Sequence, residues 1–310
     1  MEEVKDVAPD GDVILVVGAD KVKMRVSSVL LAKASPVFKT MFGPHFHDGQ
    51  QPRGASNPIE IPLPDDSGES MHRLCKMVHL VCEQHEDFGD PLNIFNLAEC
   101  IDKYCCAGPL RLQSSAILFN CLEFYDFHVL ADRDFWSVTS AAYFMDCSKA
   151  FKVATTRLVY DTKGEFDLEG FDHLPGSVIG AICEKRATTQ RDFCWKLAGL
   201  GIPTCDSHRC RNQDQAFMER LANAFQIEYW PPNFAFQPLC SLLATTRALP
   251  DIVRARPSCV HTNSIRMLEN VTFCEAAQSI EENYQGMCLG CAKTGRSSLY
   301  GSCDEHARNL

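Results

Sequence analysis

The chain lacks the segments that direct a protein into or across a membrane. Its first residues, Met1 to Gly11, are acidic and contain no apolar stretch of the kind that forms a signal peptide. Its longest apolar run, Val13 to Val17, has the size of a strand, far short of the roughly 20 residues that a membrane-spanning helix needs. These absences predict a cytosolic or nuclear protein without a membrane partner.

Runs of lysine and arginine are absent too. The 310 residues carry 30 basic and 40 acidic side chains, which gives a net charge of −10. A surface that binds nucleic acid needs a basic face that displaces counterions from phosphate, so we expect no direct contact with nucleic acid. With 45% hydrophobic and 23% charged residues, the composition is that of an ordinary globular protein of about two domains.

Sequence signatures of catalytic sites are missing as well. The chain has no glycine-rich dinucleotide or phosphate loop, no Gly-x-Ser-x-Gly elbow and no His-Glu-x-x-His helix. Its 17 cysteines and 10 histidines are numerous enough for one pair to lie close by chance, so their presence alone does not indicate a thiol enzyme. We therefore predict a protein that is not an enzyme.

Cysteine is the residue in unusual excess. Its number is odd and no secretory signal precedes it, so we expect free thiols that pack as small apolar side chains in a reducing compartment. Five of them fall on the apolar stripes of expected helices: Cys75, Cys82, Cys100, Cys105 and Cys121.

The front of the sequence predicts strands and helices in mixed order. Val13 to Val17 suits a buried strand, and Lys21 to Val26 alternates polar and apolar residues as a half-buried strand does. Turn residues between the two indicate a hairpin. Two short helices are expected next, over residues 28–34 and 37–42, and Pro36 suits the start of the second.

One more strand and then only helices are expected. The strand is Ile59 to Ile61, which Pro62 should end. A capped helix follows, with an apolar stripe formed by Met71, Leu74, Cys75, Val78, Val81 and Cys82. Further helices are expected over residues 92–105, 109–121, 135–154, 176–200, 214–229 and 264–282. This order predicts an α+β part in front and an all-α part behind.

These elements resemble the BTB/POZ domain. The resemblance rests on several pieces in the right order: Asp12-Val13, Met24 to Leu30, Ala34 to Phe42, Ile59 to Asp66 with the helix after it, and Leu97 to Cys105. It implies a tail over residues 1–9, a BTB/POZ domain with a small mixed sheet flanked by helices over 10–130, and a mainly α-helical domain over 131–310. The second half resembles that of fungal single-BTB-domain proteins, which end in a Cys-x-x-Cys similar to Gly286 to Cys291 here.

The resemblance implies association with other proteins through the BTB domain. The partner is expected to be a second copy, a transcription-related protein, or a cullin scaffold for which the chain acts as a ubiquitin-ligase adaptor. Cullin contacts in the family use a hydrophobic-x-Glu element, and the nearest match here is Phe46-His47-Asp48; alternatively, Phe46 anchors its loop against the core. Only 11 residues precede Asp12, too few for the strand and helix that many BTB dimers exchange.

Two further residues draw their expected roles from the resemblance. The family often has an acidic residue at the position of Asp12, buried near a basic one, and we expect Asp12 to order the domain in the same way. The family often has a histidine at the position of Ser27, so the local role of that imidazole is expected to be absent.

A Cys-x-x-Cys near the C-terminus has the spacing of a zinc knuckle, in which two thiolates from one turn bind the same ion. Cys288 and Cys291 form it. The preferred partners are Cys259 and His261, because resembling proteins tend to keep Cys and His in that loop. The alternative partners are Cys303 and His306, and a loop over 205–210 offers further ligands.

The expected ion is one structural Zn²⁺, and it leads to an alternative function, a zinc-stabilised regulatory domain that acts through its helical half. Packed thiols and a dithiol redox switch are the other interpretations of the same motif.

Trp195 is expected to pack inside the helical half, and His72, His79 and His85 are expected at the surface.

Overall fold

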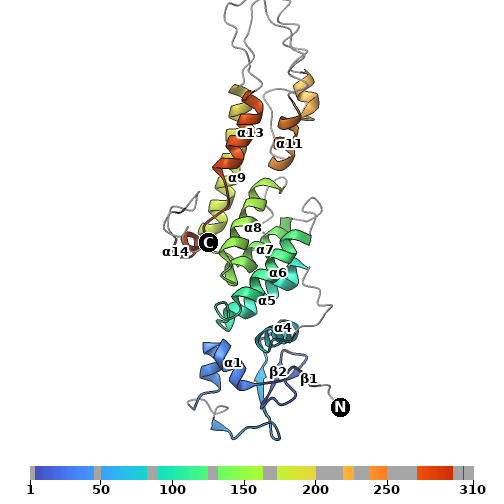
Figure 1. Ribbon diagram of the computed structural model, residues 1–310, viewed down its shortest axis with the longest axis vertical. Coiled ribbons are helices and arrows are strands. Elements are labelled where there is room, and N and C mark those ends of the chain that lie inside the picture. The colour runs from blue at the N-terminus through green and yellow to red at the C-terminus, as the bar shows by residue number, and fades with distance from the viewer. Residues whose placement is uncertain are drawn as a thin grey trace, which may run out of the picture. The chain divides into compact units, whose positions relative to one another are not determined.

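The computed structural model describes residues 4–44, 50–81, 90–124, 132–162, 173–199, 219–226, 237–249, 271–295 and 303. The chain forms two compact units, Met1–Ala154 and Thr155–Leu310, whose elements are labelled in Figure 1. The first unit holds a small mixed sheet with helices and the second is helical, as the sequence predicts. The expected domain end at residue 130 stays a prediction. No described helix has both the length and the apolar character to cross a membrane.

The first unit is built on a four-stranded sheet in the order β1-β3-β2-β4. Strands β2 (Val13–Val17) and β3 (Val22–Val26) form the predicted antiparallel hairpin. Strand β4 (Ile59–Leu63) pairs with β2 in parallel, and β1 (Val4–Asp6) pairs with β3 in parallel. Part of the segment that was expected to be a tail is therefore a strand of the sheet.

Strand β4 continues through Pro62, which was expected to end it. The backbone N–H of Ile59 donates to the carbonyl of Asp12, 3.2 Å away. The N–H groups of the odd-numbered residues of β4 therefore point toward β2. The nitrogen of Pro62 then points to the open edge, where a missing donor costs no ladder hydrogen bond. The expectation was wrong because it ignored that β4 is an edge strand.

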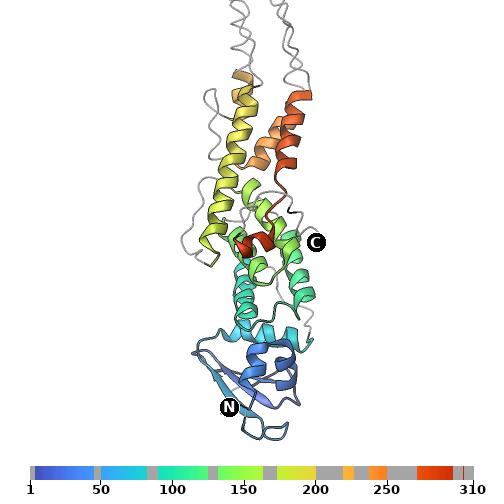
Figure 2. The same ribbon diagram turned by 90° about the vertical axis from the view of Figure 1, so that its left-hand side faces the viewer.

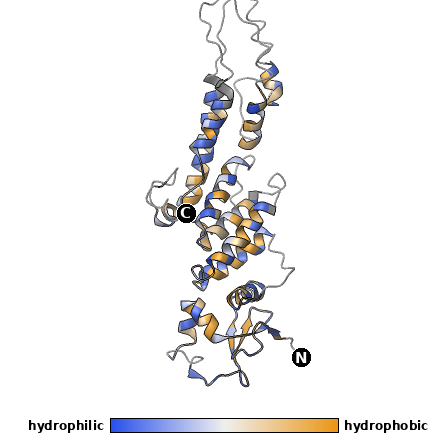
Figure 3. Ribbon diagram, viewed as in Figure 1, coloured by the Kyte–Doolittle hydropathy of each residue, from blue (hydrophilic) through white to orange (hydrophobic). Residues whose placement is uncertain are grey.

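Helices cover the sheet and form the rest of the first unit. Figures 1 and 2 show α1 (Ser28–Ala34) and α2 (Pro36–Met41) on one face of the sheet. The helices after β4 are α4 (Gly68–Val78), α5 (Pro91–Lys103), α6 (Arg111–Phe124) and α7 (Asp132–Phe144). Helix α5 packs against α4, α6 and α7. Figure 3 shows the hydrophobic residues of this unit gathered in the hairpin and along α5 to α7.

Three predicted helices end or break early, each at a residue with positive φ. Helix α4 stops before Leu80 (φ 56°), so Val81 is exposed. Helix α5 stops before Cys105 (φ 54°), which leaves that thiol exposed rather than on the apolar stripe. The helix expected over 135–154 is broken near Asp146 (φ 56°) into α7 and α8 (Ser148–Tyr160).

The other predicted thiols that the structure describes are buried, as expected: Cys75, Cys100 and Cys121. Burial raises the pKa of Cys121 to about 12, and that of the neighbouring buried Cys106 to about 11. These thiols therefore stay protonated near neutral pH and pack as small apolar groups. Cys82 lies outside the described residues.

The second unit contains α9 (Gly176–Gly199), α11 (Leu239–Ala248), α13 (Val271–Asn283) and α14 (Leu289–Thr294). Helix α13 packs against both α9 and α11. Nζ of Lys196 donates to Oγ of Ser279 at 2.6 Å, which links α9 to α13. Trp195 is 72% exposed, so the prediction that it packs inside this unit was wrong.

Candidate interaction surface and thiol cluster

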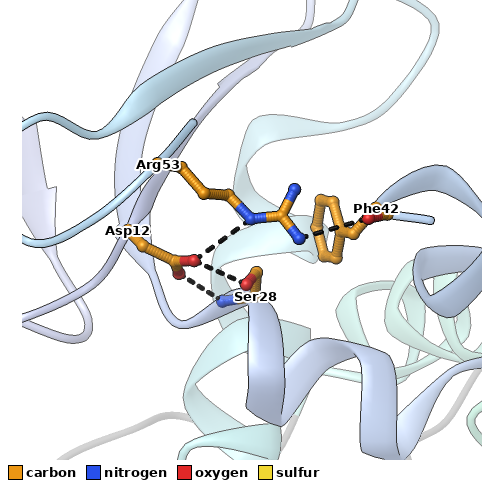
Figure 4. A network of polar contacts seen from close by, with 4 residues as sticks. All are labelled: Asp12, Ser28, Phe42 and Arg53. Atoms are coloured by element: carbon orange, nitrogen blue, oxygen red, sulfur yellow. Dashed lines mark hydrogen bonds and ion pairs between the residues drawn. The ribbon is translucent and has the colours of Figure 1, made fainter. Parts of the chain in front are cut away.

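Asp12 ties the start of β2 to the start of α1 (Figure 4). Its Oδ1 accepts from the backbone N–H of Ser28 at 2.8 Å, and its Oδ2 accepts from Oγ of Ser28 at 2.6 Å. The first N–H groups of a helix have no partner within the helix, so this carboxylate satisfies one of them from a distant part of the chain. Asp12 thereby fixes the position of α1 on the sheet.

Arg53 completes this network. Its Nε lies 3.3 Å from Oδ2 of Asp12, its Nη2 donates to the carbonyl of Phe42 at 3.1 Å, and its guanidinium lies over the Phe42 ring. Burial favours a higher pKa for Asp12, but the hydrogen bonds from Ser28 and the charge of Arg53 outweigh it and hold the pKa below its usual 3.8. The expected pairing of Asp12 with a basic residue is thus present, and its role is to order the domain.

A second polar contact holds the start of α1. The backbone N–H of Ser27 donates to Nε2 of His79 at 2.9 Å, and Nδ1 of His79 lies 2.7 Å from the carbonyl of Cys75. An imidazole therefore does reach the position of Ser27, contributed by the end of α4. His79 was expected at the surface and is half-buried instead. Its spacing of four residues from Cys75, which lies on the predicted apolar stripe, indicates partial burial of His79, but no local pattern indicates its contact with Ser27.

Two of the motifs that carry the family resemblance meet in space. Oδ1 of Asp66 accepts from Nζ of Lys103 at 2.7 Å, and Oδ2 accepts from the hydroxyl of Tyr104 at 2.8 Å. The Tyr104 ring stacks on Phe38 with 4.4 Å between centroids. These contacts tie the end of β4, the end of α5 and helix α2 together.

An exposed apolar pair lies on α1. Ser28 and Leu31 face inward, whereas Val29 is 58% and Leu30 is 40% exposed. Because Asp12 and His79 hold the two residues at the start of this helix, Val29 and Leu30 keep a fixed position at the surface. A preorganised apolar patch of this kind is suited to contact with another protein.

A cluster of three thiols lies near the C-terminus. The Sγ atoms of Cys288, Cys291 and Cys303 all lie within 4.8 Å of one another, and those of Cys291 and Cys303 are 3.3 Å apart. Cys291 is buried, and the other two are half-buried. The sequence-predicted pair is thus joined by Cys303, the alternative partner. Three thiols at these distances are able to bind a metal ion.

The segment before the cluster is anchored to the Thr155 end of α8. Oγ1 of Thr155 accepts from the backbone N–H of Met287 at 2.9 Å, and the hydroxyl of Tyr284 donates to the Thr155 carbonyl at 3.4 Å. The hydroxyl of Tyr160 donates to the carbonyl of Ile280 at 2.9 Å. The turn that carries Cys288 therefore begins from a fixed point.

The remaining predicted site residues lie outside the described part of the chain. They are Phe46 and Asp48 of the cullin motif, and Cys259, His261 and His306 of the metal site. The cullin contact and the choice of a fourth metal ligand therefore stay predictions. Sequence reasoning missed Arg53 and His79, since neither belongs to a recognisable motif.

Comparison with known proteins agrees with this arrangement. Residues 9–88, which include β2 to α4, match the family model of the BTB/POZ domain. No curated protein matches the chain. The similarity of residues 97–105 to later BTB helices and that of the second half to fungal proteins stay predictions. The chain therefore carries a BTB/POZ domain, a module that mediates association between proteins, including pairs of identical chains.

Proposed function

We propose that the protein is a non-enzymatic assembly module whose first unit pairs with a second copy through α1. The observation that carries this proposal is the exposure of Val29 and Leu30 on a helix that Asp12 and His79 hold in place. In a two-fold dimer the same patch meets itself, so each copy covers the apolar side chains of the other. Stable interfaces typically bury about 1,200–2,000 Å², so the proposed dimer requires residues around this pair to take part as well.

The test is the mass of the full-length protein in solution over a range of concentrations, by light scattering after size exclusion. We expect a dimer for the natural sequence and a monomer for Leu30→Glu, because the substitution would bury a charge in the interface. Leu112→Glu is the matched control: Leu112 is 83% exposed on α6, and its variant should stay dimeric.

Two outcomes contradict the proposal. The first is that the natural protein is a monomer at every concentration. The second is that Leu30→Glu and Leu112→Glu have the same mass in solution. Circular dichroism of each variant shows whether the fold is intact.

The buried thiols of Cys75, Cys100 and Cys106, which pack as small apolar groups, support a reducing compartment, the cytosol or the nucleus, as the place of action. A second candidate function, a metal-stabilised regulatory domain, is favoured by the thiol cluster of the second unit. In this case the helical half binds a partner protein, and the BTB unit brings copies of the chain together. Loss of partner binding in Cys288→Ser, with the dimer retained, would favour this candidate, whereas loss in Leu30→Glu alone would favour the first.

A further inference from the structure

We propose that Cys288, Cys291 and Cys303 bind one Zn²⁺ as thiolates and form a structural metal site in the second unit. The proposal deepens the second candidate function by naming the metal and its ligands. It does not depend on pairing through α1.

The distances between the sulfur atoms fit a shared ion. Zn–S bonds of about 2.3 Å in a tetrahedral site place two sulfurs about 3.8 Å apart. The cluster has one pair at 3.3 Å and all three sulfurs within 4.8 Å, so the expected separation lies inside the observed range. A disulfide needs about 2.05 Å and joins only two sulfurs, and would leave the third without a role.

The backbone explains why the three sulfurs converge. Cys288 is the N-cap of α14 and Cys291 lies in its first turn, so a single turn brings both side chains to one side. Helix α14 ends at Gly295, where φ is 65°. This left-handed conformation suits glycine and reverses the chain direction after a helix. Cys303, twelve residues after Cys291, lies at the same turn, with its Sγ 3.3 Å from that of Cys291.

The packing around the turn positions it independently of any ion. The side chains of Tyr284, Met287 and Leu289 are almost fully buried, and the hydrogen bonds to Thr155 fix the backbone at Met287. Nζ of Lys185 lies 5.4 Å from the centre of the Tyr284 ring. Ligands held in this way lose little conformational freedom when the metal binds, which favours high affinity.

The donor set selects the metal. Thiolates are soft ligands that prefer Zn²⁺ over Ca²⁺ or Mg²⁺, which require oxygen donors. Three thiols release three protons as Zn²⁺ binds, so affinity falls as pH falls.

A structural site takes four ligands, and the sequence offers His306, three residues after Cys303, or Cys259 with His261; all three lie outside the described residues.

The experiment is native mass spectrometry of the full-length protein, purified with zinc and then treated with a chelator. We expect one Zn²⁺ per chain, lost on chelation and lost from Cys288→Ser, Cys291→Ser and Cys303→Ser. The matched controls are Cys183→Ser and Cys240→Ser, which change half-buried thiols elsewhere in the same unit and should keep the metal. The variant that loses zinc among His306→Ala, Cys259→Ser and His261→Ala identifies the fourth ligand.

A second measurement covers the case in which a serine variant fails to fold. Co²⁺ in place of Zn²⁺ gives a sulfur-to-metal charge-transfer absorption whose intensity counts the bound thiolates. Three thiolates confirm the site, and four confirm it with an additional cysteine as ligand. Two or fewer, a zinc-free natural protein, or a natural protein lighter by the two hydrogens of a disulfide would overturn it.

The same variants separate this inference from the proposed pairing. Leu30→Glu should be a monomer that keeps its zinc, and Cys288→Ser should be a dimer without zinc. A zinc-free dimer of the natural chain would therefore disprove the metal site alone, and a zinc-loaded monomer would disprove the pairing alone.

Discussion

The backbone N–H of Ser27 and Nε2 of His79 are joined by a hydrogen bond of 2.9 Å although 52 positions separate them in the chain. Because Nε2 accepts this bond, the proton of the neutral ring lies on Nδ1, which faces the Cys75 carbonyl at 2.7 Å. The end of α4 thus holds the start of α1 through a ring that must stay uncharged.

This contact should make stability depend on pH. Burial lowers the pKa of His79 below its usual 6.5, although the Cys75 carbonyl and Asp10 oppose the shift. As pH falls below about 6.5, the unfolded chain therefore takes up the proton first, and the free energy of unfolding decreases until the folded pKa is passed. We expect a loss of about 1 kcal/mol at most, since solvent partly screens the ring.

Urea unfolding at pH 7.5 and 5.5 measures this loss. His79→Gln should be less stable at pH 7.5 and should show a smaller difference between the two pH values. Leu112→Gln, at an exposed position of α6 without a titratable group, should keep the full difference. An unchanged pH dependence in His79→Gln would show that another group is responsible.

Removing the carboxylate of Asp12 should destabilise the first unit. Asp12→Ala leaves the Ser28 N–H without its acceptor and Nε of Arg53 without its carboxylate, and we expect a cost of about 1–3 kcal/mol. Glu60→Ala breaks the exposed ion pair with Lys23 and should change stability by less than about 1 kcal/mol. Equal effects in chemical unfolding would contradict the ordering role of Asp12.

The contact between Asp66 and Tyr104 should matter more than the one between Asp66 and Lys103. Tyr104→Phe keeps the stacked ring but removes a donor from a nearly buried carboxylate, for a cost of about 1–2 kcal/mol. Lys103→Ala removes a half-exposed ammonium and should cost about 0.5 kcal/mol. Thermal unfolding of the two variants in the same buffer ranks them, and the reverse order would count against this account.

Alkylation should distinguish the cysteines at the end of α5. Cys105 is exposed, whereas the neighbouring Cys106 is buried and burial raises its pKa to about 11. Iodoacetamide at pH 7.5 should therefore modify Cys105 at least tenfold faster than Cys106 or Cys121, because the thiolate is the nucleophile. Peptide mapping after short exposure gives the rates. Similar rates in the folded protein would contradict the difference in exposure between Cys105 and Cys106. Denatured protein serves as the control, since all three thiols are then accessible to the reagent.

Much of the first unit was predictable because its periodicities are local. The hairpin, the two short helices and Pro36 at the start of α2 follow from patterns within a few residues. The positive φ of Leu80, Cys105 and Asp146 was not predictable, since none of them is glycine and nothing in the neighbouring sequence requires that conformation. Helix α11 was missed because its sequence has no marked polar face.

The candidate sites were predictable only where a motif is local. The Cys288-x-x-Cys291 spacing identified two thiols, but the sequence could not show that Cys303, twelve residues after Cys291, lies beside them. The ordering role of Asp12 was expected from the family resemblance, but the identity of its basic partner Arg53 and the contact of His79 with Ser27 were not predictable, since both side chains come from distant segments.

Pro62 also limits how the sheet can grow. A strand edge with a complete row of N–H and C=O groups invites a further strand from another chain, and proline removes one donor from that row. The β4 edge is thereby a poor template for strand addition. Among the described strands, the other open edge is the three-residue β1, where Lys5 and Asp6 are exposed. Partners that bind by extending the sheet are thus directed to β1.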